Sequence, residues 1–431
     1  MEPELNYKNA DDVLKYRNTE STSKITLSNR FQFVYILVLA LSSFTFFRPS
    51  LLDPVYLRFS NLNNQLFLLL FLPAIPIIVW FIFKKNRYLF TLPMNLLTIS
   101  IVVSMLMANV FWDQKPMTSV YGAALPVLGY TFYYYLMAKA ISIKTVESII
   151  VVIGVMFIVF FLFSFSVYPI RIFAYKETND REFLRLFLYG DGFLFLFYFF
   201  AINKFLFNKN KLWLVLALLA YLCVILNQTR VYIVATAAIT LWYFIRSKGM
   251  FLKVATVSII VVGFLILPQL DFIQGLQKKT QSDLGNTDEY IRVKAGKYFL
   301  NKFQQSPFTR IFGNGLYADN ESRYSKEIIR LQTERGFYVQ DVGLVGLYVY
   351  LGLVGLVAYA MIFYRSLKTK LVEKYDYLKM FMIFIICSCM TTDSTFSGSY
   401  VFPIVFTLYL YEHCRVGAQI TFVSVSLPKR H

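Results

Sequence analysis

Histidine is scarce in this sequence, with only two among 431 residues, His413 and His431, both near the C-terminus. Charged residues are also few, at 16%, whereas soluble domains average roughly 25%. The four cysteines all fall in or beside apolar runs, at Cys223, Cys387, Cys389 and Cys414. Their placement excludes a disulfide framework and a zinc knuckle. Acid–base chemistry away from the C-terminus would therefore depend on carboxylates or on no protein base.

Several motifs typical of particular enzyme classes are also missing. The sequence has no P-loop, no nucleophile elbow and no carboxylate pair at a recognisable metal-binding spacing. These absences argue against nucleotide-driven and serine-hydrolase chemistry, and we expect neither metal nor cofactor. No internal repeat is visible, unlike in many secondary transporters. The first apolar run begins near Phe31, too late for a signal peptide, and lacks a small-residue cleavage pattern.

Apolar residues dominate what is present: 57% of the chain is hydrophobic and 18% aromatic. Runs long enough to cross a hydrocarbon core of about 30 Å recur along it, which predicts an all-α polytopic membrane protein. We predict about twelve transmembrane helices. Their spans are 31–47, 66–83, 90–112, 119–140, 147–168, 187–205, 212–228, 231–246, 251–268, 341–364, 377–395 and 399–414.

Positive charge predicts the orientation of these helices. The formal charge is +18, from 43 Lys and Arg against 25 Asp and Glu. Lys and Arg concentrate in alternate loops, which places both termini in the cytoplasm by the positive-inside rule. This explanation of the charge leaves no need for a nucleic-acid partner.

One polar interval stands out between the ninth and tenth spans. The predicted organisation is a cytoplasmic segment 1–30, spans over 31–268, an extracytoplasmic loop 269–340, spans over 341–414 and a cytoplasmic tail 415–431. Within the loop we predict an amphipathic helix after Asn286, a stop at Ser306-Pro307, a turn at 313–315 and a second helix from Asn320 to Arg335.

Three outward-facing features are candidates for chemistry. Arg230 opens the eighth span, where it either snorkels to headgroups or binds an anion. The loop from Arg171 to Arg185 carries four basic residues against the orientation rule, either paired with its own acids or binding an anion. Asp341 lies where the loop meets the tenth span, either as a helix cap or as a base.

Several stretches, in this order, resemble the O-antigen polymerase and O-antigen ligase superfamily. They are LNQTRVY at 226–232, Arg292 with Tyr298, SP at 306–307, IFGNG at 311–315, and LGLVG at 351–355. The number of spans and the position of the large loop are also similar to the family's layout. The resemblance implies a GT-C-type membrane glycosyltransferase that uses a polyprenyl-diphosphate-linked glycan as donor.

In the ligases of this superfamily, a His-Asn pair precedes the closing glycine pattern by eleven residues. Counting back eleven from Gly352 reaches Asp341. The departure from histidine favours a polymerase over a ligase. The spacing from Arg335 to Gly346 also resembles an Arg-x10-Gly pattern of some polymerases.

We therefore expect a polymerase of surface polysaccharide repeat units in the bacterial inner membrane. Asp341 would be the catalytic residue, and the residues binding diphosphate or glycan would be Arg230, Arg335, Arg185, Arg292 and Arg310. The expected partners are an undecaprenyl-diphosphate-linked oligosaccharide, the bilayer and a chain-length regulator. Alternatives are a ligase acting on a lipid A core, a lipid-linked oligosaccharide flippase and a non-catalytic scaffold.

Overall fold

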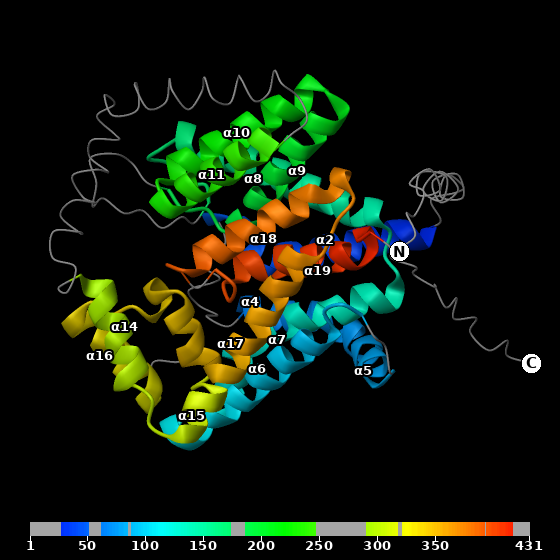
Figure 1. Ribbon diagram of the computed structural model, residues 1–431. Coiled ribbons are helices and arrows are strands. Elements are labelled where there is room, and N and C mark those ends of the chain that lie inside the picture. The colour runs from blue at the N-terminus through cyan, green and yellow to red at the C-terminus, as the bar shows by residue number, and fades with distance from the viewer. Residues whose placement is uncertain are drawn as a thin grey trace, which may run out of the picture.

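The computed structural model describes residues 27–50, 62–84, 88–173, 186–246, 290–317, 321–392 and 394–416. Within these ranges the chain is helical, with only two isolated bridges and no strand. Figure 1 shows long helices packed side by side, with a smaller helical group at one edge. The prediction of an all-α protein is confirmed for this part of the chain.

Helices cover each predicted apolar run that falls in the described ranges. The long helices are α2 (Leu27–Ser43), α4 (Leu62–Phe71), α5 (Ile75–Phe83), α6 (Thr91–Trp112), α7 (Pro116–Lys139), α8 (Ile143–Ser166), α9 (Asp191–Asn208), α10 (Lys211–Asn227), α11 (Arg230–Arg246), α17 (Leu344–Lys368), α18 (Asp376–Cys389) and α19 (Gly398–Cys414). The predicted run 251–268 lies outside the described residues.

Length and composition alone mark some of these helices as able to cross a membrane. Within the described part of the chain, the segments that qualify are Asn64–Phe83, Thr91–Trp112, Ile143–Ser166 and Leu344–Lys368. Arg30–Ser43 and Lys211–Asn227 are apolar but shorter. Several apolar helices are thus compatible with a membrane protein, while the count of twelve spans stays a prediction.

The centre of the molecule is formed by helices that are apolar on every side. Every side chain from Gly192 to Asn203 in α9 is buried, and α19 is buried almost throughout. A helix without a polar face packs stably only when other helices surround it. Accordingly α9 packs against α8, α10, α18 and α19.

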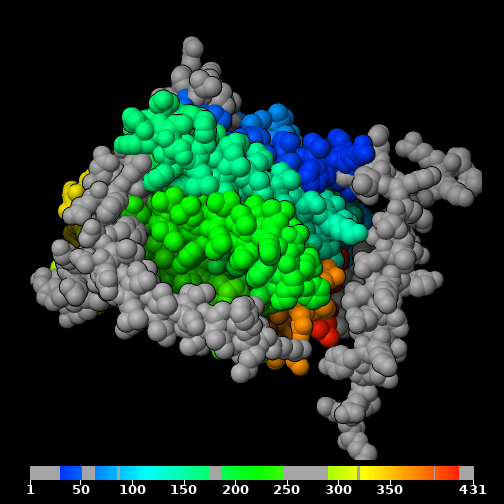
Figure 2. Space-filling model, turned by 90° about the horizontal axis from the view of Figure 1, so that it is seen from above, coloured from blue at the N-terminus to red at the C-terminus, as the bar shows by residue number. Residues whose placement is uncertain are grey.

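The outer helices instead expose apolar side chains. In the view from above, the surface of residues 186–246 lies next to that of α8, with α2 beyond it (Figure 2). On this part of the chain the exposed large apolar residues include Leu212, Leu218, Val234 and Trp242. Such a surface suits contact with lipid rather than water.

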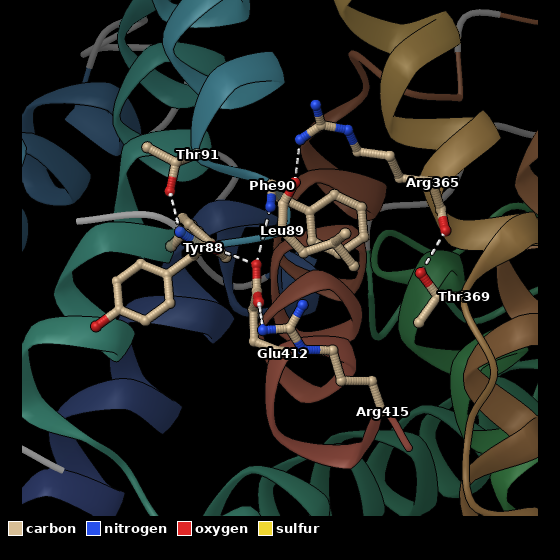
Figure 3. A network of polar contacts seen from close by, with 9 residues as sticks. Tyr88, Leu89, Phe90, Thr91, Arg365, Thr369, Glu412 and Arg415 are labelled. Carbon is tan, nitrogen blue, oxygen red and sulfur yellow. Dashed lines mark hydrogen bonds and ion pairs between the residues drawn. The ribbon is translucent and has the colours of Figure 1, made fainter. Parts of the chain in front are cut away.

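A polar network ties four helices together at one end of the bundle. The buried Glu412 carboxylate of α19 accepts a hydrogen bond from the Phe90 backbone N–H at 2.9 Å (Figure 3) and another from the Tyr133 hydroxyl of α7 at 2.7 Å. Arg365 of α17 donates to the Leu89 carbonyl, and Arg415 lies 4.0 Å from Glu412. A buried carboxylate needs such partners to offset its lost hydration. This end therefore joins the start of α6 with α7, α17 and α19.

The described part of the predicted loop, residues 290–317 and 321–340, forms a helical group with the turn that follows it, and we call this group the outer module. It consists of α14 (Ile291–Asn301), α15 (Pro307–Phe312), α16 (Arg323–Arg335) and the 3-10 turn η5 (Val339–Val342). Figure 1 places it beside α17 and the end of α6. The sequence predicted α14, α16 and the turn at 313–315, but not α15, whose Ser306–Thr309 capping box starts a new helix at Pro307.

The tenth predicted span is not one straight helix. Gly352 has φ 64° and ψ −164°, which divides α17 into Leu344–Leu351 and a longer second part. The first part packs with the outer module, and the second continues along the bundle. The structure therefore joins the loop and the membrane helices through a break at Gly352.

Candidate active site

The outer module is fixed to the bundle through Asn314. The Trp112 indole N–H, at the end of α6, donates to the Asn314 side-chain oxygen at 2.8 Å. The Asn314 amide nitrogen donates to Gln304 at 2.9 Å and to the Val349 carbonyl at 3.0 Å. All three side-chain bonds are buried, so removing Asn314 would leave buried polar groups unpaired.

Backbone bonds complete this attachment. Asn314 N–H donates to Val349, and Gly315 N–H donates to Tyr350, both at 2.9 Å. These carbonyls belong to the last turn before the break in α17. The last carbonyls of a helix have no hydrogen-bond donor within the helix itself. The turn 313–315 therefore caps the first part of α17 and positions the segment that leads back to Asp341.

Asp341 lies in η5, between the end of α16 and the start of α17. Its Oδ2 atom is 4.0 Å from Arg292 Nη2 of α14, and the two side chains are 49% and 40% exposed. Among the described residues this guanidinium is the only cation paired with Asp341. The structure thus brings together two predicted site residues that are far apart in sequence.

Arg335, six residues before Asp341 in the chain, contacts α14 at a different residue. Its guanidinium is 5.4 Å from the centre of the Tyr298 ring, on α14. Burial and the neighbouring Glu327 raise the pKa of Tyr298 above its usual value, so its phenol stays protonated at neutral pH. Because α14 carries both Arg292 and Tyr298, it contacts the 335–341 segment at two points.

Arg230 belongs to another part of the structure. It is the first residue of α11, after a hairpin in which Gln228 has φ 58° and Thr229 donates to Asn227 at 2.7 Å. Arg230 is half-buried, and α11 packs against α18. Within the described residues, Asp341 and Arg335 make their side-chain contacts with α14 and not with Arg230.

Of the remaining predicted arginines, Arg310 is exposed on the last turn of α15. Arg185 lies outside the described residues. Asp191, which opens α9, accepts a hydrogen bond from Tyr400 at 2.8 Å and thereby links α9 to α19, a structural role that accounts for its position.

Residues that periodicity did not single out line a cleft that shares Tyr298 with the Arg335 contact. They include the buried Trp112 and Phe303 and the charged Lys302 and Arg323. The available signal was the position of Trp112 at the end of a predicted span, which periodicity marked only as a helix end. Contact between that helix end and residues of α16 could not be read from spacing.

The arrangement offers a carboxylate and several guanidinium groups at the surface of the outer module. A carboxylate can accept a proton from a hydroxyl, and guanidinium groups can bind phosphate oxygens in pairs. Among the described residues there is no group of three His, Cys, Asp or Glu that could hold a metal ion.

A protein-family model described as O-antigen ligase matches residues 214–397 of this chain. The matched part runs from α10 through the outer module to the turn before α19, and so includes Arg230, Arg292, Arg335 and Asp341. No curated protein matches the chain. The match confirms the predicted resemblance to the superfamily of O-antigen ligases and polymerases, without distinguishing its two branches.

Proposed function

We propose that this protein is a membrane glycosyltransferase that polymerises lipid-linked repeat units of a surface polysaccharide. The observation that carries the proposal is the Arg292–Asp341 ion pair, inside the matched region and at the position where ligases of the superfamily have histidine. A family role in surface polysaccharide biosynthesis follows from the match. The choice of polymerase over ligase rests on the residue at position 341.

In the proposed reaction, a hydroxyl oxygen of one repeat unit attacks the anomeric carbon of a second, undecaprenyl-linked glycan. The bond from that carbon to the diphosphate oxygen breaks, and undecaprenyl diphosphate leaves with the bonding electrons. Asp341 accepts the hydroxyl proton, and Arg292 orients the carboxylate. The products are one lengthened glycan and one free lipid diphosphate.

The negative charge that develops on the leaving diphosphate requires fixed cations. Arg230 would bind it at the bundle, with Arg335 or Arg185 as a second donor, and Arg310 would contact the glycan. Preorganised donors of this kind lower the barrier because they need no rearrangement as charge develops. Guanidinium groups alone could provide this stabilisation, so we propose a metal-independent GT-C enzyme.

The proposed setting is the bacterial inner membrane, with about twelve spans, both termini in the cytoplasm and the outer module on the other side. The bilayer would hold the lipid tails of donor and acceptor. A chain-length regulator would be a further partner. The ligase and the flippase remain the competing functions, and they share the same lipid-linked glycan.

The test is a gel of surface polysaccharide from cells that lack this gene, complemented with wild type, Arg230→Ala or Asp341→Asn at equal membrane levels. Lys326→Ala is the matched control, because Lys326 is exposed on α16 and outside the pair. We expect a full ladder with wild type and control, and single anchored repeat units with the two site variants.

Other outcomes would identify a different function. Loss of anchored glycan with accumulation of lipid-linked polymer would indicate a ligase. Loss of all extracytoplasmic lipid-linked glycan would indicate a flippase. A full ladder from cells without the gene would contradict any essential role in the polymer, and a full ladder from both site variants would overturn the residue assignments.

A further inference from the structure

A cleft of about 310 Å³ opens between the end of α6, α14 and α16. This volume is at the lower end of the range for small-molecule sites. Three aromatic side chains line it, of which Trp112 and Phe303 are almost fully buried. The other lining residues are polar or charged, namely Lys302, Gln305, Arg323 and Glu327.

The cleft is held in shape by contacts that cross all three elements. Arg323 of α16 donates to Gln305 at 2.8 Å and to the Phe111 carbonyl of α6 at 3.2 Å, and its guanidinium lies 5.5 Å from the Trp112 ring. Trp112 in turn stacks on Phe303, with ring centres 5.1 Å apart. A site held this way loses little conformational freedom when a ligand binds.

The charged groups of the cleft differ in how far they are already paired. Glu327 forms an ion pair with Arg330 at 2.8 Å and accepts a hydrogen bond from the Tyr298 hydroxyl at 3.5 Å. Lys302 is exposed at the end of α14, and within the described part of the chain its ammonium has no hydrogen bond or ion pair. The one uncommitted charge of the cleft is therefore positive.

The cleft adjoins the proposed reaction site through a shared side chain. Tyr298 lines the cleft, and its ring also contacts the guanidinium of Arg335. Arg335 precedes Asp341 by six residues in the chain. A ligand in the cleft would thus contact the same side chain that Arg335 contacts. A long glycan would reach the cleft by extending beyond the reacting sugar.

We propose that this cleft is a glycan subsite that binds a sugar residue bearing a carboxylate, with Lys302 and Arg323 pairing with the acidic group. The inference rests on the proposed function for the identity of the glycan as substrate. The partly buried Tyr298 would lie against the sugar ring, and Gln305 and Glu327 would bind its hydroxyls. The repeat unit would then contain an acidic sugar.

The charges favour one carboxylate over the diphosphate of the lipid carrier. The lining holds two cations and one anion, and the anion, Glu327, is already paired with Arg330, so the two cations can pair with a negative ligand group. A diphosphate would bring more negative charge close to Glu327, and like charges at short range are unfavourable. A neutral sugar would leave the Lys302 ammonium without a partner.

The test measures sugar binding to the purified full-length protein in detergent by saturation-transfer NMR, independently of polymer synthesis. The probes are a disaccharide that contains a hexuronic acid and the matched disaccharide with the neutral hexose. Wild type is compared with Lys302→Met, and Lys326→Met serves as control because it removes an exposed lysine of α16 that is not part of the cleft.

We expect the acidic disaccharide to bind wild type and the control equally, and Lys302→Met about tenfold more weakly, since one charge-assisted contact is lost. The neutral disaccharide should bind all three about equally and weakly. Equal binding of both sugars to wild type, or unchanged affinity in Lys302→Met, would overturn the proposal. If binding contradicts the proposal but cells with the wild-type gene make a normal polymer ladder, the proposed polymerase function stands and only the subsite is wrong. If the acidic disaccharide binds selectively but cells lacking the gene still make a full ladder, the subsite stands and the proposed polymerase function is wrong.

Discussion

Asp341 and Arg292 are arranged in a way that suits chemistry better than stability. Their atoms are 4.0 Å apart, and both side chains are close to half exposed. An exposed ion pair at this distance stabilises a protein by about 0–1 kcal/mol, because water screens both charges. A carboxylate that water and substrate can reach is, however, free to accept a proton. The pair is therefore of little use to the fold and accessible to a hydroxyl.

This contrast gives a prediction for Arg292→Ala. We expect the midpoint of thermal unfolding in detergent to change little, since less than about 1 kcal/mol is lost. The polymer ladder should shorten or disappear, because Asp341 loses the cation that orients it. Arg330→Ala is the control, as it removes another exposed arginine that pairs with a carboxylate of the outer module. A ladder of normal length from Arg292→Ala at equal membrane levels would show that the pair has no part in the reaction.

The sequence identified both residues of this pair but not their contact. Arg292 was found through the family resemblance, and Asp341 through its position at the re-entry point. Their approach depends on α14 lying against η5, which is a tertiary contact that periodicity does not encode. For the same reason the contact of the Arg335 guanidinium with the Tyr298 ring could not be predicted from the sequence.

At the scale of elements, the break in α17 is what connects the outer module to the bundle. Gly352 adopts φ 64°, and a Cβ atom there would lie 2.4 Å from both the Gly313 nitrogen and the Ile311 carbonyl oxygen. The sequence pattern LGLVG drew attention to this glycine, but its apolar neighbours predicted a continuous span. A left-handed residue inside an apolar run has no periodic signal, so the break could not be predicted.

We therefore expect Gly352→Ala to loosen the outer module. The added methyl group must displace backbone atoms of Gly313 and Ile311, and a side chain at this φ is itself strained. Limited proteolysis of the purified protein should cut faster in the 302–340 segment, and thermal stability should fall by a few kcal/mol, roughly the scale of a strained backbone position with overpacking.

Gly296→Ala is the matched control for this variant. Gly296 lies inside α14, and a Cβ atom there would meet nothing within 4 Å. Because alanine favours a helix over glycine by about 1 kcal/mol, this variant should be unchanged or slightly more stable. Equal proteolysis rates for Gly352→Ala and wild type would show that the turn 313–315 tolerates the methyl group and does not hold α17 in place.

For the whole molecule, the arrangement of buried and exposed helices agrees with a protein that packs its own core and presents apolar sides to lipid. The aromatic stretch Phe193–Phe200 of α9 lies inside, whereas α10 and α11 expose Leu218, Val234 and Trp242. The Glu412 network lies at the end where α6 starts and α17 and α19 finish (Figure 3). The outer module adjoins the opposite end of α6 through Trp112. Composition predicted this class of architecture, because burial of all-apolar helices and exposure of lipid-facing ones both follow from hydropathy.

The two ends of α6 therefore mark the two sides of the membrane, and the orientation of the protein can be measured from residues near them. Lys139 of α7 is predicted on the cytoplasmic side and Lys294 of α14 on the opposite side. Both lysines are exposed, so Lys139→Cys and Lys294→Cys should each react with a maleimide if the reagent reaches that side. The natural Cys387 is exposed and is first changed to serine, while the other three thiols are buried. With a membrane-impermeant maleimide on intact spheroplasts, we expect labelling of Lys294→Cys alone, and labelling of Lys139→Cys only after permeabilisation. The positive-inside bias is the physical reason, since basic loops are retained in the cytoplasm. The reverse pattern would place the Arg292–Asp341 pair in the cytoplasm, where it could not act on glycans already exported, and the proposed polymerase would then be untenable.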